Sequence, residues 1–157
     1  MVKIFGAVLI VFCGVAFGFL LNKRARDALV QTEGFIELVR YLRNEIDCFS
    51  MPIPLALARC PDSIFQKCGI GACNNIRTVE ELICECEMQG EELGEVMERF
   101  AADVGRGYKH EQLALCERTV KRLESYRASL AGQLPAKQKL NGTLCLCFAL
   151  ALVILLI

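Results

Sequence analysis

Histidine and tryptophan are almost absent from this sequence: among 157 residues there is one His, His110, and no Trp. A metal site built from several imidazoles is therefore excluded, because it needs at least a second histidine. The phosphate-binding loops G-x-x-x-x-G-K-[ST] and G-x-G-x-x-G are missing. The G-x-S-x-G nucleophile elbow is missing as well. We therefore expect no enzymatic activity from this chain alone and no cofactor.

The chain also lacks an excess of one charge sign. It has 18 Lys and Arg against 18 Asp and Glu, and no cluster of basic residues forms a stripe. Nucleic-acid binding requires such a stripe, so we expect no nucleic-acid partner. The neighbouring carboxylates Glu80 and Glu81, like Glu91 and Glu92, fall on polar helix faces, where we expect them to be solvated.

Two long apolar runs stand at the ends of the sequence, residues 4–21 and 140–157. Each has the length of a bilayer-spanning helix, which needs roughly 17–25 apolar residues. The alternatives for the first run are a cleaved signal peptide and a buried core helix. A signal peptide should end in a small-residue cleavage site, but Asn22, Lys23, Arg24 and Arg26 follow this run. We therefore predict a transmembrane helix at 4–21 and a second at 140–157.

Basic residues flank the inner ends of both runs: Lys23, Arg24 and Arg26 follow the first, and Lys137 and Lys139 precede the second. Because positive flanks stay on the cytoplasmic side, the domain between them, residues 27–136, is predicted to lie in the cytoplasm. An odd number of the 10 cysteines falls between the runs. These cysteines cannot all pair within one chain, which agrees with a reducing compartment.

The cysteine spacing offers a second hypothesis, a membrane-tethered metal-binding or redox protein. It would use Cys68, Cys73, Cys84 and Cys86. Zinc sites usually show paired C-x2–4-C knuckles, but Cys84 and Cys86 are one residue apart in a helical pattern and should point to different sides. We favour small buried core residues for these cysteines. A third reading, a membrane sensor of a small ligand, stays open.

Helical spacing dominates the middle region, which predicts an all-α bundle of about six helices. From 27 to 49 the apolar residues Ile36, Val39, Leu42, Ile46 and Phe49 form one stripe. Prolines then predict short helices at 54–59 and 61–68. Thr78 and Glu81 form a capping-box pattern for a helix ending near Gly90. Further helices are expected at about 91–104 and 108–134, and Pro135 should bend the chain before the second span.

Some positions suggest roles in assembly. Gly14 and Gly18 form a G-x-x-x-G pattern, which allows close helix packing in lipid. Whether the partner helix comes from a second copy, making a homo-oligomer, or from another subunit stays open. Glu45 and Gln112 are ordinary surface positions by spacing alone.

Blocks along the whole chain resemble the stage III sporulation protein AB family. They are "KIFGAVLI" (Lys3 to Ile10), "RNEIDCFSMPIPLALA" (Arg43 to Ala58), Val104-Gly105 with Gln112 downstream, and the apolar tail "LVILLI". The first two blocks are the most specific. The resemblance makes Glu45, Pro52 and Gln112 family-motif positions and implies for them a role in partner contact or in the fold.

The resemblance implies a non-enzymatic platform or scaffold subunit of a secretion-like complex needed for endospore formation. The protein would lie on the mother-cell side of the outer forespore membrane. Its soluble domain would be similar to helical domains of the platform proteins of type II secretion and type IV pilus systems. The implied partners are other subunits of the complex, above all its cytosolic ATPase, stage III sporulation protein AA.

Overall fold

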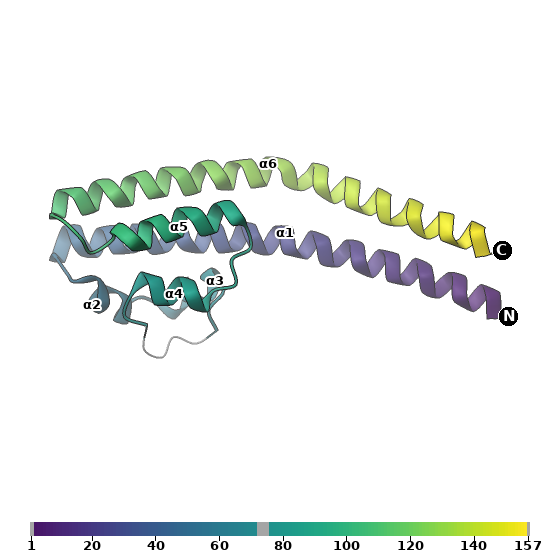
Figure 1. The fold of residues 1–157 in the computed structure, drawn as a ribbon, viewed down its shortest axis with the longest axis horizontal. Helices are drawn as coiled ribbons and strands as arrows, with labels where there is room; N and C mark the ends of the chain where they lie inside the picture. The colour runs from purple at the N-terminus through teal and green to yellow at the C-terminus, as the bar shows by residue number, and fades with distance from the viewer. Residues whose placement is uncertain (1, 72–75, 157) are drawn as a thin grey trace. The chain divides into compact units, whose positions relative to one another are not determined.

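The computed structural model describes the backbone of residues 2–71 and 76–156, and side chains mainly in 23–71 and 76–135. These residues form six helices and no strand, so the predicted all-α class is confirmed for the part described (Figure 1). The helices are α1 (Val2–Phe49), α2 (Ile53–Ala58), α3 (Asp62–Cys68), α4 (Val79–Glu85), α5 (Glu91–Asp103) and α6 (Lys109–Leu156).

Helix α1 runs without a break through the predicted first span, the basic segment after it and the first helix of the middle region. Lys, Arg and Ala favour the helix, so nothing in residues 22–28 ends it. The helix ends after Phe49, where Ser50 has a φ of 47°. The Met51 N–H then donates to the Glu45 carbonyl at 3.3 Å, which closes the last turn.

The two prolines after α1 and the proline after α2 set the short helices that follow. Pro52 is the N-cap of α2, and its carbonyl accepts from the Leu55 and Ala56 N–H groups at 3.0 Å. Pro61 is the N-cap of α3, which ends at the left-handed Gly69. Both short helices therefore form where the sequence predicts them.

Helix α4 begins with the predicted capping box: Thr78 accepts from the Glu81 N–H, and the Glu81 carboxylate accepts from the Thr78 N–H. The prediction that this helix continues to about Gly90 is wrong. Cys86 has an extended backbone and ends the helix after Glu85, and Gly90 is the N-cap of α5 instead. The intervening backbone is held by a side chain of α1, as described below.

Helix α6 continues through Pro135 to Leu156, so Pro135 does not separate two helices. A proline inside a helix removes one backbone hydrogen bond, and the long helix continues on both sides of that gap.

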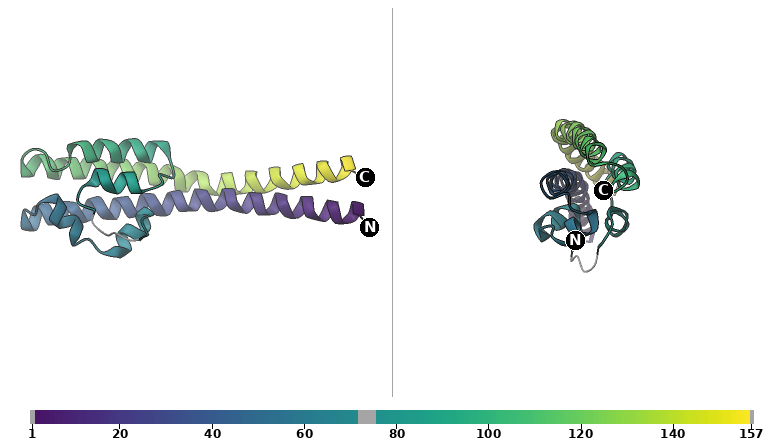
Figure 2. Two further views of the ribbon diagram at one scale, coloured as in Figure 1. Left: turned by 60° about the horizontal axis from the view of Figure 1, so that its bottom comes forward. Right: turned by 90° about the vertical axis from the view of Figure 1, so that its left-hand side faces the viewer.

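The chain divides into two compact units, one of Met1–Asp27 with Leu130–Ile157 and one of Ala28–Ser129. We call the second the bundle unit. Within it, the α1 segment lies between α6 on one side and the short helices α2 and α3 on the other (Figures 1 and 2). Helices α4 and α5 pack against each other.

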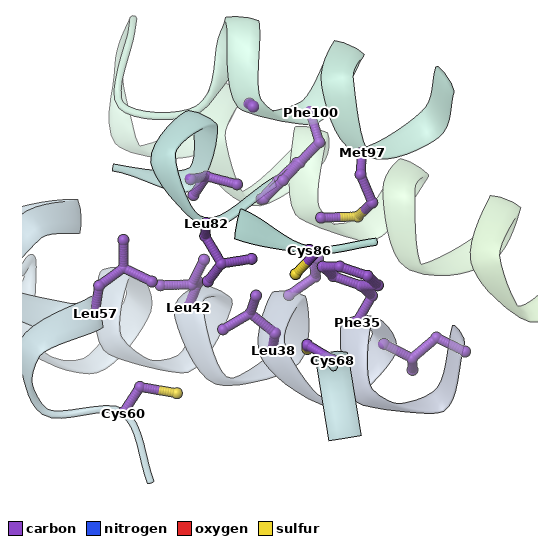
Figure 3. Packing of buried hydrophobic residues seen from close by; sticks show 14 of the residues in the cluster. Phe35, Leu38, Leu42, Leu57, Cys60, Cys68, Leu82, Cys86, Met97 and Phe100 are labelled. Carbon is purple, nitrogen blue, oxygen red and sulfur yellow. The ribbon is translucent and has the colours of Figure 1, made fainter. Parts of the chain in front are cut away.

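The core of the bundle unit forms around α1 (Figure 3). Phe35, Leu38 and Leu42 are fully buried, as are Leu82 of α4 and Phe100 of α5. Because helices pack against α1 from more than one side, its buried face is wider than the single stripe that the sequence predicts. Four of the five stripe residues are buried: Ile36, Val39, Leu42 and Ile46. The prediction for Phe49 is wrong, since this last residue of α1 is 68% exposed.

Among the described residues, we find no helix with enough length and apolar character to cross a membrane. Nearly all side chains of 4–21 and 140–157 lie outside the described set, and the two spans stay predictions.

Candidate interaction surface

Ion pairs join α1 to α6 along the bundle unit. Arg43 Nη2 lies 2.8 Å from Glu117 Oε1, and Arg127 Nε donates to Glu33 Oε1 at 2.7 Å. Arg40 pairs with Glu124 in the same way. These partners are partly exposed, so each pair contributes little stability, typically below about 1 kcal/mol. Their order along the two antiparallel helices matches a single register of α1 against α6.

Gln31 is a buried residue whose importance the sequence analysis missed. Its Nε2 donates to the Cys68 carbonyl at 2.9 Å and to the Glu87 carbonyl at 3.0 Å. Its Oε1 accepts from the Gln89 N–H at 2.8 Å. One amide thus binds the end of α3 and the link between α4 and α5 to α1. The available signal was its position one turn before Phe35, on the face that α1 buries.

Gly34, also missed, allows α3 to touch α1. A methyl group at Gly34 would lie 2.7 Å from the Lys67 carbonyl carbon and 2.8 Å from the Cys68 nitrogen. These are backbone atoms that cannot rotate away, so only glycine fits this contact.

Gln112 is buried, with 6% exposure, and is not the surface residue that spacing indicated. Its Oε1 accepts from the Gly105 N–H at 2.9 Å, and its Nε2 donates to the Arg106 carbonyl. Gly105 and Gly107 both have positive φ angles, so the turn between α5 and α6 is tight. Gln112 therefore acts in the fold by holding this turn.

The other predicted positions fall in different places. Glu45 is half-buried and its carbonyl helps to end α1, while Pro52 is exposed and begins α2. Gly14 and Gly18 lie in α1, but the surroundings of their side-chain positions are outside the described residues. Their packing role stays a prediction.

The four cysteines of the metal or redox hypothesis do not share one environment. Cys68 and Cys86 are part of the hydrophobic core, and Cys84 is exposed on α4. Cys73 lies outside the described residues. No group of three or more metal-ligating side chains occurs in the portion of the chain that the structure describes. The expectation of buried core residues is confirmed for Cys68 and Cys86 and is wrong for Cys84, because Cys84 faces away from the core.

Cys116 of α6 is a further core thiol. Burial raises its pKa from 9.0 to about 11, although the nearby Arg43 guanidinium acts in the opposite direction. The thiol is therefore protonated at neutral pH and poorly nucleophilic. Burial also raises the pKa of Tyr41 and of Tyr126, with smaller contributions from Glu45 and Glu92 respectively.

The carboxylates of α4 and α5 lie on the surface, as the sequence predicts for Glu80, Glu81, Glu91 and Glu92. Glu85, Glu95 and Glu98 are exposed on the same two helices.

Large apolar side chains are exposed at the end of α1, within α2 and at the α5–α6 turn. Phe49 is 68% exposed, Leu55 is 46% exposed and Tyr108 is 75% exposed. The Tyr108 ring stacks on His110, with 6.2 Å between ring centroids.

These features define an all-helical bundle protein with a continuous core. Ion pairs join its two long helices, and two buried glutamines bind backbone groups of the connecting segments. Residues 3–69 match the family model described as stage III sporulation protein AB (spore_III_AB). This match confirms the family resemblance, and it covers α1, α2 and α3. The description of this family refers to stage III of sporulation. No curated protein and no solved structure matches the chain.

Proposed function

We propose that this chain is a non-enzymatic platform subunit of a secretion-like complex of endospore formation, and that its bundle unit binds the cytosolic assembly ATPase, stage III sporulation protein AA. The observation that carries the proposal is the family match over residues 3–69. A platform must hold its binding surface in one shape while a partner moves against it.

The contacts of the bundle unit support such a role. Four ion pairs join α1 to α6 in the described part of the chain, and Gln31 binds two further parts of the chain to α1. A surface that is already ordered loses little conformational entropy when a partner binds. The unit can therefore offer a preformed surface to the ATPase.

The proposal includes two membrane anchors, at 4–21 and 140–157, with the bundle unit in the cytoplasm. Three basic residues are exposed in the described part of α1: Lys23, Arg24 and Arg26. Basic residues next to the cytoplasmic end of a transmembrane helix must be exposed in this way. Both anchors would then hold the unit at the same membrane face, where a cytosolic ATPase can reach it.

Binding of the full chain, held in lipid nanodiscs, to the purified ATPase tests the proposal. We expect saturable binding in at least one nucleotide state, and no binding to nanodiscs without the chain. Absence of binding in the apo, ADP and ATP-analogue states would refute the proposed partner. Elemental analysis of the same preparation separates the metal hypothesis, which requires a stoichiometric metal that Cys68→Ser or Cys84→Ser releases.

A further inference from the structure

Charge is divided unevenly between the two compact units, although the chain as a whole is neutral. Of the 18 acidic residues, only Asp27 lies outside the bundle unit. Six of the 18 basic residues lie outside it: Lys3, Lys23, Arg24, Arg26, Lys137 and Lys139. The bundle unit is therefore net negative and the other unit is net positive. An anionic partner is attracted by the second unit and repelled by the first.

Three of these basic residues have described side chains, and we call them the α1 basic segment: Lys23, Arg24 and Arg26. All three side chains are exposed. None of them forms an ion pair among the described residues, and neither does the neighbouring Asp27. The positive charge of the α1 basic segment is thus open to an anionic partner.

Apolar side chains are exposed on the same face of α1, directly before the basic segment. Phe19 is 72% exposed and Leu20 is 58% exposed, and Ala16 is exposed as well. Ala16, Phe19, Leu20 and Lys23 follow the i, i+3, i+4, i+7 spacing, so they share one face of the helix. With a rise of 1.5 Å per residue, this face changes from apolar to basic within about 10 Å.

The combination of an apolar and a basic part favours a phospholipid over other anionic partners. Soluble phosphate or an acidic protein segment can pair with basic residues, but neither supplies acyl chains to cover Phe19 and Leu20. A phospholipid joins a charged headgroup to acyl chains, so it matches both parts of this face at once. The order of the two parts also agrees with the predicted span at 4–21, which places the basic segment at the level of the headgroups.

We propose that this face of α1, from Ala16 to Arg26, binds anionic phospholipids such as phosphatidylglycerol in preference to phosphatidylcholine. The inference rests on the membrane anchors of the proposed function and is independent of its ATPase partner. The acyl chains cover Phe19 and Leu20, and the headgroup phosphate accepts hydrogen bonds from the α1 basic segment. The choline ammonium of phosphatidylcholine is repelled by the same residues. Each basic residue near the surface strengthens binding by a factor of about five.

Because the chain has no tryptophan, a single introduced indole can report on this face. The full chain with Phe19→Trp is placed in phosphatidylcholine vesicles that contain either brominated phosphatidylglycerol or brominated phosphatidylcholine. Quenching of the indole gives the relative binding constant of each lipid at position 19. We expect phosphatidylglycerol to bind at least about fivefold more tightly, and added salt should lower this ratio. Equal quenching by the two lipids at low salt would overturn the inference.

Two sets of charge-removing substitutions identify the residues responsible. Changing all of the α1 basic segment to Gln in the Phe19→Trp chain should bring the ratio of binding constants close to one. The matched control set consists of three exposed basic residues of α6 in the bundle unit that form no ion pair among the described residues: Arg118, Lys121 and Arg122. Changing this control set to Gln should leave the ratio unchanged. Loss of the preference in both sets, or in neither, would overturn the site.

Soluble competitors test the nature of the partner. Glycerol 3-phosphate has the charged group of the lipid without its acyl chains, and at millimolar concentration it should leave the ratio unchanged. If glycerol 3-phosphate abolished the preference, the partner would be a soluble anion. If a polyglutamate peptide abolished it, the partner would be an acidic protein segment. Either result would overturn the lipid assignment.

The outcome for the lipid site can be separated from the outcome for the proposed function. ATPase binding is measured on its own, with the chain in nanodiscs of phosphatidylcholine alone. ATPase binding without a lipid preference would overturn only the lipid site, and a lipid preference without ATPase binding would overturn only the proposed partner. An indole that neither brominated lipid quenches would show that position 19 does not lie in the membrane, which would overturn the lipid site and the membrane anchors together.

Discussion

Replacing Gly34 by alanine should destabilise the protein, although the same change usually stabilises a helix. Alanine has a higher helix propensity than glycine by about 1 kcal/mol. At position 34, however, the new methyl group would lie 2.7 Å from the Lys67 carbonyl carbon. Carbon atoms pack at roughly 3.5–4.0 Å, so α3 must move away from α1 by several tenths of an ångström or more.

The expected cost follows from what this movement disturbs. Overpacking of a tight contact costs roughly 1–3 kcal/mol. The hydrogen bond from Gln31 to the Cys68 carbonyl, 2.9 Å long, lies at the same contact and contributes roughly 1 kcal/mol. After the gain in helix propensity is subtracted, we expect Gly34→Ala to lower the free energy of unfolding by about 1–3 kcal/mol.

Urea unfolding of the full chain in detergent, followed by circular dichroism, measures this difference. Gly94 in α5 is the matched control, because a methyl group there would meet only the Met88 side chain, at 4.0 Å. We expect Gly94→Ala to raise the free energy of unfolding by up to about 1 kcal/mol. If Gly34→Ala is as stable as the wild type, or more stable, the close contact between α1 and α3 does not exist as described.

Three further predictions concern single residues. Ser50 has a φ of 47°, which is strained for a residue with a side chain, so Ser50→Gly should raise the free energy of unfolding by about 1 kcal/mol; an unchanged value would contradict a left-handed Ser50. Gln31→Leu should lower it by roughly 2–4 kcal/mol, because it leaves two carbonyls and one N–H without their partner; a neutral effect in the same assay would argue against the three bonds. Cys116 keeps its proton in the folded state to about pH 11 but ionises near pH 9 when unfolded. The contribution of the protonated Cys116 thiol to the free energy of unfolding is therefore complete below pH 9 and is lost as the pH rises to 11. Since each pKa unit corresponds to about 1.4 kcal/mol, the wild type should lose roughly 2–3 kcal/mol more than Cys116→Ala over this range. Parallel curves for the two proteins would show that the thiol is not buried.

Local signals explain most of the helices that the sequence predicts correctly. Prolines set the starts of α2 and α3, and Thr78 with Glu81 sets the start of α4. These helix-start signals involve only residues close together in the sequence, so they can be recognised without knowledge of the tertiary structure. The family resemblance, too, depends on short blocks and was confirmed over residues 3–69.

The errors arise where a distant residue decides the local structure. The sequence predicts that α4 ends near Gly90, but Gln31, far away in the sequence, binds the backbone at Glu87 and Gln89 outside a helix. Gln112 looked like a surface residue because its spacing does not show the turn that it holds.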